Sequence, residues 1–190
     1  MKKLITFFVV LALSVGTIAA QSFSAQVEAG LNVSKLTDLD SKCGFNVGVR
    51  GELGLPYNLY VNAGLFLSMK GAEQDIAKVN AYYFELPIHL GYKYEINNAI
   101  AVFGEFGPYF SVGAFGKTSA KAGNVKVSED TFGDEGFDRF DFGLGLRAGV
   151  EILKKIPVAI GYDFGLVDAA GIEGGSVKNG NFTLSVGYKF

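Results

Sequence analysis

The sequence predicts an all-β protein, an eight-stranded antiparallel up-and-down β-barrel that crosses a membrane. Three observations predict this fold class. The N-terminus has the pattern of an export signal, apolar and polar residues alternate through most of the remaining chain, and the links between the alternating segments are short and long in turn. The length of 190 residues suits one such domain.

Residues 1–20 form the predicted export signal. Two lysines near the start precede an apolar stretch over residues 4–16, which is too short to span a bilayer as a helix. Small residues then allow cleavage after Ala19 or Ala20. We therefore expect a removed signal peptide over residues 1–20 and an outer-membrane β-barrel domain over residues 21–190, in the envelope of a Gram-negative bacterium.

Alternation with a period of two predicts the strands. It is clearest over residues 138–152, where Phe, Leu, Ala, Val and Ile alternate with Asp, Gly, Arg and Glu from position 140 onward. It is weakest in the first and fifth segments. Each segment is long enough to cross a bilayer as a tilted strand. The eight segments are 23–34, 43–55, 58–71, 80–95, 99–115, 138–152, 156–167 and 180–190.

Link lengths predict how the strands are oriented in the membrane. The links over residues 56–57, 96–98 and 153–155 are short, whereas the others are longer and the link over residues 117–137 is the longest. Outer-membrane barrels have short periplasmic turns and longer extracellular loops. Alternation continues over residues 124–128, so we expect the fifth and sixth strands to extend above the membrane as a hairpin.

Alternation alone does not say which face of the strands points outward. In a soluble lipocalin-like exported binder the apolar face would line the interior. The polar face here carries many charges and glycines, which suits a crowded lumen, and the apolar face has aromatic residues near one end, at Tyr92, Tyr94, Tyr188 and Phe190. We therefore expect the apolar face to contact outer-membrane lipid, with the soluble binder as an alternative.

The polar face places thirteen titratable residues in the predicted lumen. An eight-stranded barrel has room for side chains and little more, and an unpaired buried charge is costly, so these residues should pair and plug the lumen. The alternative is a narrow channel or transporter for ions or small solutes. The thirteen are Glu28, Arg50, Glu52, Lys70, Glu85, His89, Lys93, Glu105, Asp141, Arg147, Glu151, Asp163 and Lys189.

The sequence offers little chemistry for catalysis. His89 is the only histidine, and Glu85 lies two inward positions away, so we interpret the two as a structural hydrogen-bonded pair and not as a catalytic dyad. The spacing of a zinc site and the glycine-rich loop of a phosphate site are both missing. We expect no enzyme activity, no cofactor, no metal and, without a basic run, no nucleic-acid partner. Cys43 is the only cysteine, which excludes an internal disulfide and leaves its role open.

The segment over residues 128–138 contains five acids. Calcium binds through several oxygen ligands, but the spacing matches no EF-hand, so we interpret the segment as a solvated acidic loop. It is also the candidate contact surface for an extracellular ligand or envelope protein. The sequence thus predicts a structural or surface-interaction role for the extracellular loops, and leaves the oligomeric state open. The candidate contact residues are Asp130, Phe132, Asp134, Glu135 and Phe137.

A series of short motifs in seven of the eight segments indicates a family. In order, they are Gly30-Leu31-Asn32, Cys43-Gly44-Phe45, Met69-Lys70-Gly71-Ala72, Tyr83-Phe84-Glu85-Leu86-Pro87-Ile88, Gly107-Pro108-Tyr109-Phe110, Arg139-Phe140-Asp141-Phe142-Gly143 and Tyr162-Asp163-Phe164-Gly165-Leu166. From about residue 30 to residue 190 the chain resembles the PorT-like outer-membrane β-barrel proteins of the Bacteroidetes. The resemblance implies an eight-stranded outer-membrane barrel and a proline inside the fourth strand. It implies no single activity, because its namesake is linked to protein secretion and most members have no assigned role.

Overall fold

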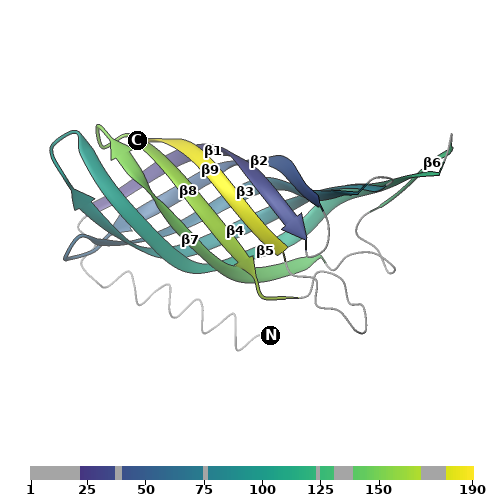
Figure 1. Cartoon of the computed structure of the whole chain (residues 1–190). Helices are drawn as coiled ribbons and strands as arrows, with labels where there is room; N and C mark the ends of the chain where they lie inside the picture. Colours follow the sequence, from purple (N-terminus) through teal and green to yellow (C-terminus); the bar gives the residue numbers. More distant parts are fainter. Residues whose placement is uncertain (1–21, 37–39, 75–76, 123–124, 131–138, 168–178) are drawn as a thin grey trace, which may run out of the picture.

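The computed structural model describes residues 22–36, 40–74, 77–122, 125–130, 139–167 and 179–190. These residues form nine strands, all paired antiparallel. They contain no helix long and apolar enough to cross a membrane. The strands are β1 (Ser22–Leu36), β2 (Asp40–Gly54), β3 (Leu59–Gln74), β4 (Ala77–Glu95), β5 (Ile100–Ala122), β6 (Val125–Asp130), β7 (Phe140–Ile152), β8 (Ile156–Gly165) and β9 (Asn179–Lys189) (Figure 1).

Eight of the nine strands close into a barrel. β1 pairs with both β2 and β9, and β4 pairs with β5, so the ring runs β1-β2-β3-β4-β5-β7-β8-β9 and returns to β1. Closure gives each barrel strand two neighbours, which satisfies backbone groups that lipid cannot hydrogen-bond. The predicted eight-stranded antiparallel up-and-down barrel is therefore confirmed.

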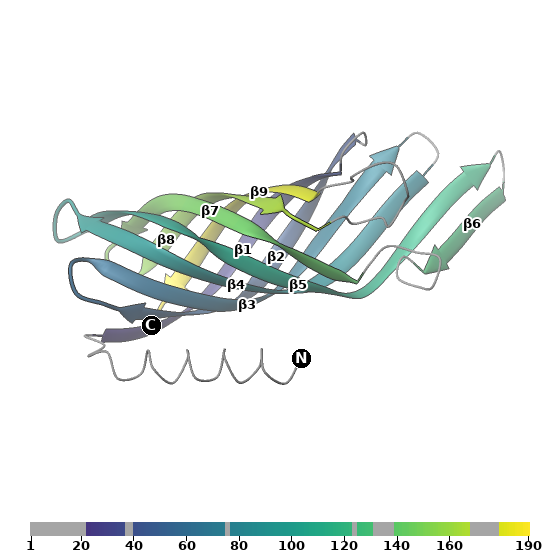
Figure 2. The same cartoon turned by 90° about the horizontal axis from the view of Figure 1, so that it is seen from below.

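The strand outside the barrel is β6. The predicted fifth strand ended at residue 115, but β5 continues to Ala122, and β6 pairs with its last six residues (Figure 2). The expected hairpin is therefore present. However, β6 is not the start of the sixth barrel strand, because the next barrel strand, β7, begins only at Phe140 and pairs with the lower part of β5.

Tight turns join the strands at one end of the barrel. Tyr57 and Asn58 have φ angles of 64° and 62°, and Leu153 and Lys154 have φ angles of 54° and 59°. Two consecutive positive φ angles define the type I′ turn, whose twist matches that of a β-hairpin, even though leucine rarely adopts this conformation. Two of the three short links predicted from the sequence are therefore tight hairpin turns, and the third is closed by a hydrogen bond from the Ile96 N–H to the Ile100 carbonyl. Together they mark the periplasmic end.

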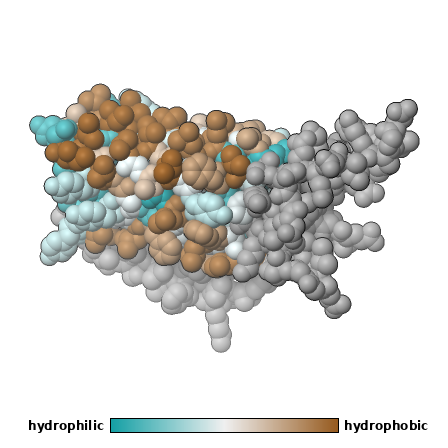
Figure 3. Space-filling view, viewed as in Figure 1, coloured by the Kyte–Doolittle hydropathy of each residue, from teal (hydrophilic) through white to brown (hydrophobic). Residues whose placement is uncertain are grey.

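Apolar side chains cover the outside of the barrel. Leu65 is 54% exposed and Leu146 54%, whereas Glu105 is 5% exposed and Arg147 6%. The space-filling view shows hydrophobic residues spread over the barrel wall (Figure 3). The soluble lipocalin-like alternative is wrong, because that fold requires the opposite arrangement of the two faces.

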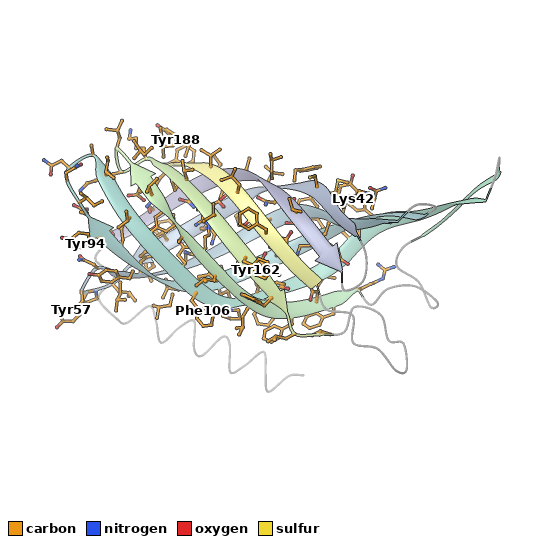
Figure 4. The ribbon with its side chains drawn as sticks, in the orientation of Figure 1. Lys42, Tyr57, Tyr94, Phe106, Tyr162 and Tyr188 are labelled. Carbon is orange, nitrogen blue, oxygen red and sulfur yellow. The ribbon has the colours of Figure 1, made fainter. Side chains whose placement is uncertain are left out.

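Aromatic side chains mark the two borders of this apolar wall. Tyr57, Tyr94 and Tyr188 lie at the turn end (Figure 4). Toward the other end, the Tyr82 ring stacks on the Phe115 ring with centroids 4.6 Å apart. Tyr92, near the turn end of β4, and Tyr82 are ten residues apart in that strand. At about 3.3 Å per residue and a strand tilt of roughly 40°, they are separated by about 25 Å along the membrane normal. This height matches the apolar band of an outer-membrane barrel.

Candidate functional site in the lumen and the outer hairpin

Two groups of four charged residues fill the lower and middle lumen. We call Glu52, Lys93, Glu151 and Lys189 the lower tetrad, because they come from the strand ends near the tight turns. The middle tetrad comprises Glu28, Arg50, Glu105 and Arg147. Each tetrad contains two acids and two bases, so each is formally neutral.

In the lower tetrad both lysines contact both acids. The Lys93 Nζ lies 2.8 Å from an oxygen of Glu52 and 2.9 Å from an oxygen of Glu151. The Lys189 Nζ lies 3.0 Å from Glu52 and also donates a hydrogen bond to Glu151. The four side chains thus form a closed ring of alternating charge across the periplasmic end of the lumen.

The middle tetrad is more deeply buried. Arg147 donates to Glu28 at 2.9 Å and to Glu105 at 3.1 Å, while the Arg50 Nε lies 3.5 Å from Glu28. The hydroxyl of Tyr60 donates to Glu105 at 2.8 Å. A carboxylate removed from water needs such partners, because desolvation otherwise costs several kcal/mol.

Inward-facing aromatic rings separate the charged groups. The Arg50 guanidinium lies 5.1 Å from the centroid of the Phe66 ring, and that of Arg147 lies 5.4 Å from the Phe103 centroid. The pattern of charged residues did not predict Phe66 or Phe103 in the lumen. Each of these two residues alternates with outward-facing neighbours in its strand, and this period of two was the signal that could have placed them in the lumen. Another was Gly64, where a Cβ atom would lie only 2.5 Å from the Phe66 ring.

His89 has a different partner from the one predicted. Its Nδ1 lies 3.6 Å from an oxygen of Glu105, and the Glu85 carboxylate instead contacts the Lys70 Nζ at 2.6 Å. The predicted His89–Glu85 pair is therefore wrong. Two residues four positions apart in one strand are separated by about 13 Å, which is beyond hydrogen-bond reach.

The upper lumen contains the remaining predicted residues. The Lys70 Nζ lies 5.1 Å from the centroid of the Tyr109 ring, and the Tyr109 hydroxyl donates to Asp141 at 3.3 Å. Asp163 accepts a hydrogen bond from the Asn181 amide at 3.1 Å. Acids outnumber bases among the predicted residues of this region, in contrast to the two neutral tetrads below.

Small cavities lie between these side chains, and the described residues line two of them. The larger, about 40 Å³, is lined by residues that include His89, Asp163 and Arg147. The smaller, about 10 Å³, lies among Tyr60, Glu105 and three members of the lower tetrad, and Arg147 also lines it. A water molecule needs roughly 10–15 Å³, so the larger cavity has room for a few waters. Arg147, a member of the middle tetrad, therefore lines both cavities.

The predicted loop contacts fall mostly beyond the described part of the chain. Asp130 is the last residue of β6, and its backbone pairs with Lys117 of β5. Phe132, Asp134, Glu135 and Phe137 lie outside the described residues, as does most of the acidic segment considered for calcium. Among the residues that are described, no group of three or more His, Cys, Asp or Glu could hold a metal ion.

The outer hairpin continues the barrel sheet beyond the wall. Residues 117–122 of β5 pair with β6 on one side, and residues 115–120 pair with β4 on the other, where β3 adds a further strand. Figure 2 shows β3, β4 and β5 running past the barrel, with β6 at their outer end. We call these extended portions of β3, β4 and β5, together with β6, the outer sheet.

A closed barrel with an apolar wall, a charged lumen and one extended end defines an integral outer-membrane protein. The chain belongs to the family described as "Outer membrane protein beta-barrel domain", whose model matches residues 5–190. No curated protein sequence matches the chain.

Solved structures show the same fold. Neisserial surface protein A is 14% identical, with 88% of this chain and 97% of that chain covered, at a TM-score of 0.51. A major outer membrane protein from Thermus thermophilus is 16% identical, with 90% and 100% covered, also at 0.51. The attachment invasion locus protein Ail of Yersinia pestis is 16% identical, with 88% and 97% covered, at 0.48. At these identities the likeness concerns the fold alone.

Proposed function

We propose that this outer-membrane barrel is a non-enzymatic surface-interaction protein that contacts ligands or other envelope proteins through its extracellular end. The observation that carries the proposal is the outer sheet, in which β5 extends to Ala122 and β6 pairs with it outside the barrel wall. A protein that served only to close and fill a barrel would need no such extension.

The charged lumen favours a structural role for the barrel itself. The tetrads pair their charges, and the only histidine lies in the lumen, 4% exposed and beside a carboxylate. A rim hydrolase needs a nucleophile within hydrogen-bond reach of a base, and among the described residues His89 has no such contact. We propose that the lumen is a structural plug.

We also propose how the chain is exported and to which narrower family it belongs. Residues 1–20 lie outside the described residues, and we propose that they are a signal peptide removed from a barrel domain over residues 21–190. The motifs of the sequence also support assignment to the PorT-like barrels of the Bacteroidetes.

Removal of the outer hairpin tests the surface role. Residues 117–130 are replaced by an Asn-Gly turn in a chain displayed on a laboratory strain, and attachment to a cultured epithelial monolayer and to glass is counted. The shortened chain should retain the gel shift of a folded barrel on heating and lose attachment. Lys154→Ala, in a periplasmic turn, is the matched control and should attach like the unaltered chain. Equal attachment with and without the hairpin would contradict the proposal.

A narrow channel is the second candidate function, favoured by the two lumen cavities that share Arg147 in their linings. Recording from the purified chain in a planar bilayer distinguishes the two functions. A plugged barrel gives no steady conductance, whereas a channel gives a defined unitary conductance. Arg147→Ala should then change that conductance, because this side chain borders both cavities.

A further inference from the structure

The outer sheet ends in a strand with one neighbour. Within the described part of the chain, β6 (Val125–Asp130) pairs only with β5. β5 itself is flanked at this height by β4 on its other side. Among the described residues no strand pairs with the outward edge of β6, and the backbone N–H and C=O groups of such an edge form a template for a further strand.

The residue types of β6 restrict which strand can pair there. A lysine on an edge strand discourages indiscriminate pairing, because its charge must meet a suitable partner. Directly opposed residues share one face of a sheet, and opposite charges at such positions are favourable while like charges are not. A matching strand therefore carries an acid opposite Lys126 and a base opposite Asp130.

A second β6 meets this requirement in one register. An antiparallel pair related by a twofold axis normal to the sheet opposes residues whose numbers differ by an even amount, because only these share a face. Two such registers pair five described residues each. Centred on Val127, Lys126 would oppose Ser128. Centred on Ser128, Lys126 opposes Asp130 of the second copy, and Asp130 opposes Lys126 of the second copy.

We propose that β6 binds β6 of a second copy of this chain, antiparallel and centred on Ser128. This inference rests on the proposed surface role and names its partner.

The direction of β6 determines where the second copy lies. β5 leads away from the barrel and β6 returns toward it (Figure 2). An antiparallel second β6 runs the opposite way, so its own barrel lies beyond the tip of the first hairpin. The contact thus joins barrels in two facing membranes and not two barrels side by side in one membrane. Its expected consequence is adhesion between like surfaces.

Charge exchange at two positions tests the register. The full chain, Lys126→Glu and Asp130→Lys are each reconstituted into phosphatidylcholine vesicles carrying one of two fluorescent labels, and co-clustering is counted. Vesicles with the unaltered chain should cluster together. Each single variant alone should cluster less by about tenfold or more, because both attractive pairs become repulsive. Vesicles with Lys126→Glu mixed with vesicles with Asp130→Lys should recover co-clustering, since every opposed pair is then attractive.

Three results would overturn the inference: no clustering of the unaltered chain, clustering of the single variants at the unaltered level, or no recovery in the mixture. The gel shift on heating verifies that each variant is folded. If hairpin-dependent attachment to epithelial cells persists while unaltered vesicles do not cluster, the surface role stands and the self-pairing inference fails. If attachment also persists without the hairpin, the surface role itself fails.

Discussion

β5 passes through two regions of the molecule that are held together differently. Within the barrel, its residues 100–112 lie between β4 and β7, and the inward Glu105 contacts Arg147 of the neighbouring β7 and Arg50 of the more distant β2. Beyond the barrel, its residues 117–120 lie between β4 and the short edge strand β6. The comparison teaches that closure and charge pairing stabilise the first region, whereas the second ends in a strand that has one neighbour among the described residues. Substitutions in the first should therefore affect stability, and those in the second should affect contacts.

The largest loss of stability is expected in the middle tetrad. Arg147→Leu leaves Glu28 and Glu105 with one fewer buried cation and should lower the free energy of unfolding by about 3–5 kcal/mol. Urea unfolding from lipid vesicles, followed by the gel shift, measures this. Lys154→Ala is the matched control, because its pair with Glu95 is 56% exposed and should contribute less than about 1 kcal/mol. Equal effects of both substitutions would mean that burial does not distinguish the two ion pairs.

A charge on the outer wall should cost somewhat less. Leu65 lies midway between the aromatic borders and is 54% exposed. Leu65→Arg should destabilise the barrel in vesicles by roughly 2–4 kcal/mol, because arginine is costly near the bilayer midplane. Leu59→Arg, level with Tyr92 of the periplasmic border, should cost only about 0–1 kcal/mol. Loss of this depth dependence would contradict the placement of the wall in lipid.

Crowding of the lumen should lower the free energy of unfolding by less than the two substitutions above. A Cβ atom at Gly91 would lie 2.3 Å from the Tyr60 ring, so Gly91→Ala should destabilise by about 1–3 kcal/mol through overpacking. At Gly104 such an atom would meet nothing within 4 Å, which makes Gly104→Ala the control. Tyr60→Leu in the Gly91→Ala background should recover part of the loss. Similar costs at both glycines would show that the Tyr60 ring does not fill this space.

The smallest effect on stability is expected from the outer hairpin. Replacement of residues 117–130 by a turn should change the free energy of unfolding by less than about 0.5 kcal/mol, because the barrel ladders below it remain complete. The same urea titration measures this. A loss comparable to that of Arg147→Leu would show that the hairpin is an integral part of the barrel, which would remove the contrast between the two regions.

The sequence by itself determined the closed sheet and its two faces. Successive side chains of a strand point to opposite faces of the sheet, so Arg147 had to face the lumen if Leu146 faced lipid. The sheet had to close into a ring because lipid cannot hydrogen-bond its edges. Link lengths likewise indicated the periplasmic end.

The structure decided which charges meet. His89 contacts Glu105 and not Glu85, because partners across a lumen depend on strand stagger and tilt, which no local pattern encodes. Phe66 points inward, although apolar, because glycines beside it leave a space for its ring. Only the ladder between β5 and β6 showed that the hairpin stands outside the barrel, since alternation reads the same whether a strand has one neighbour or two.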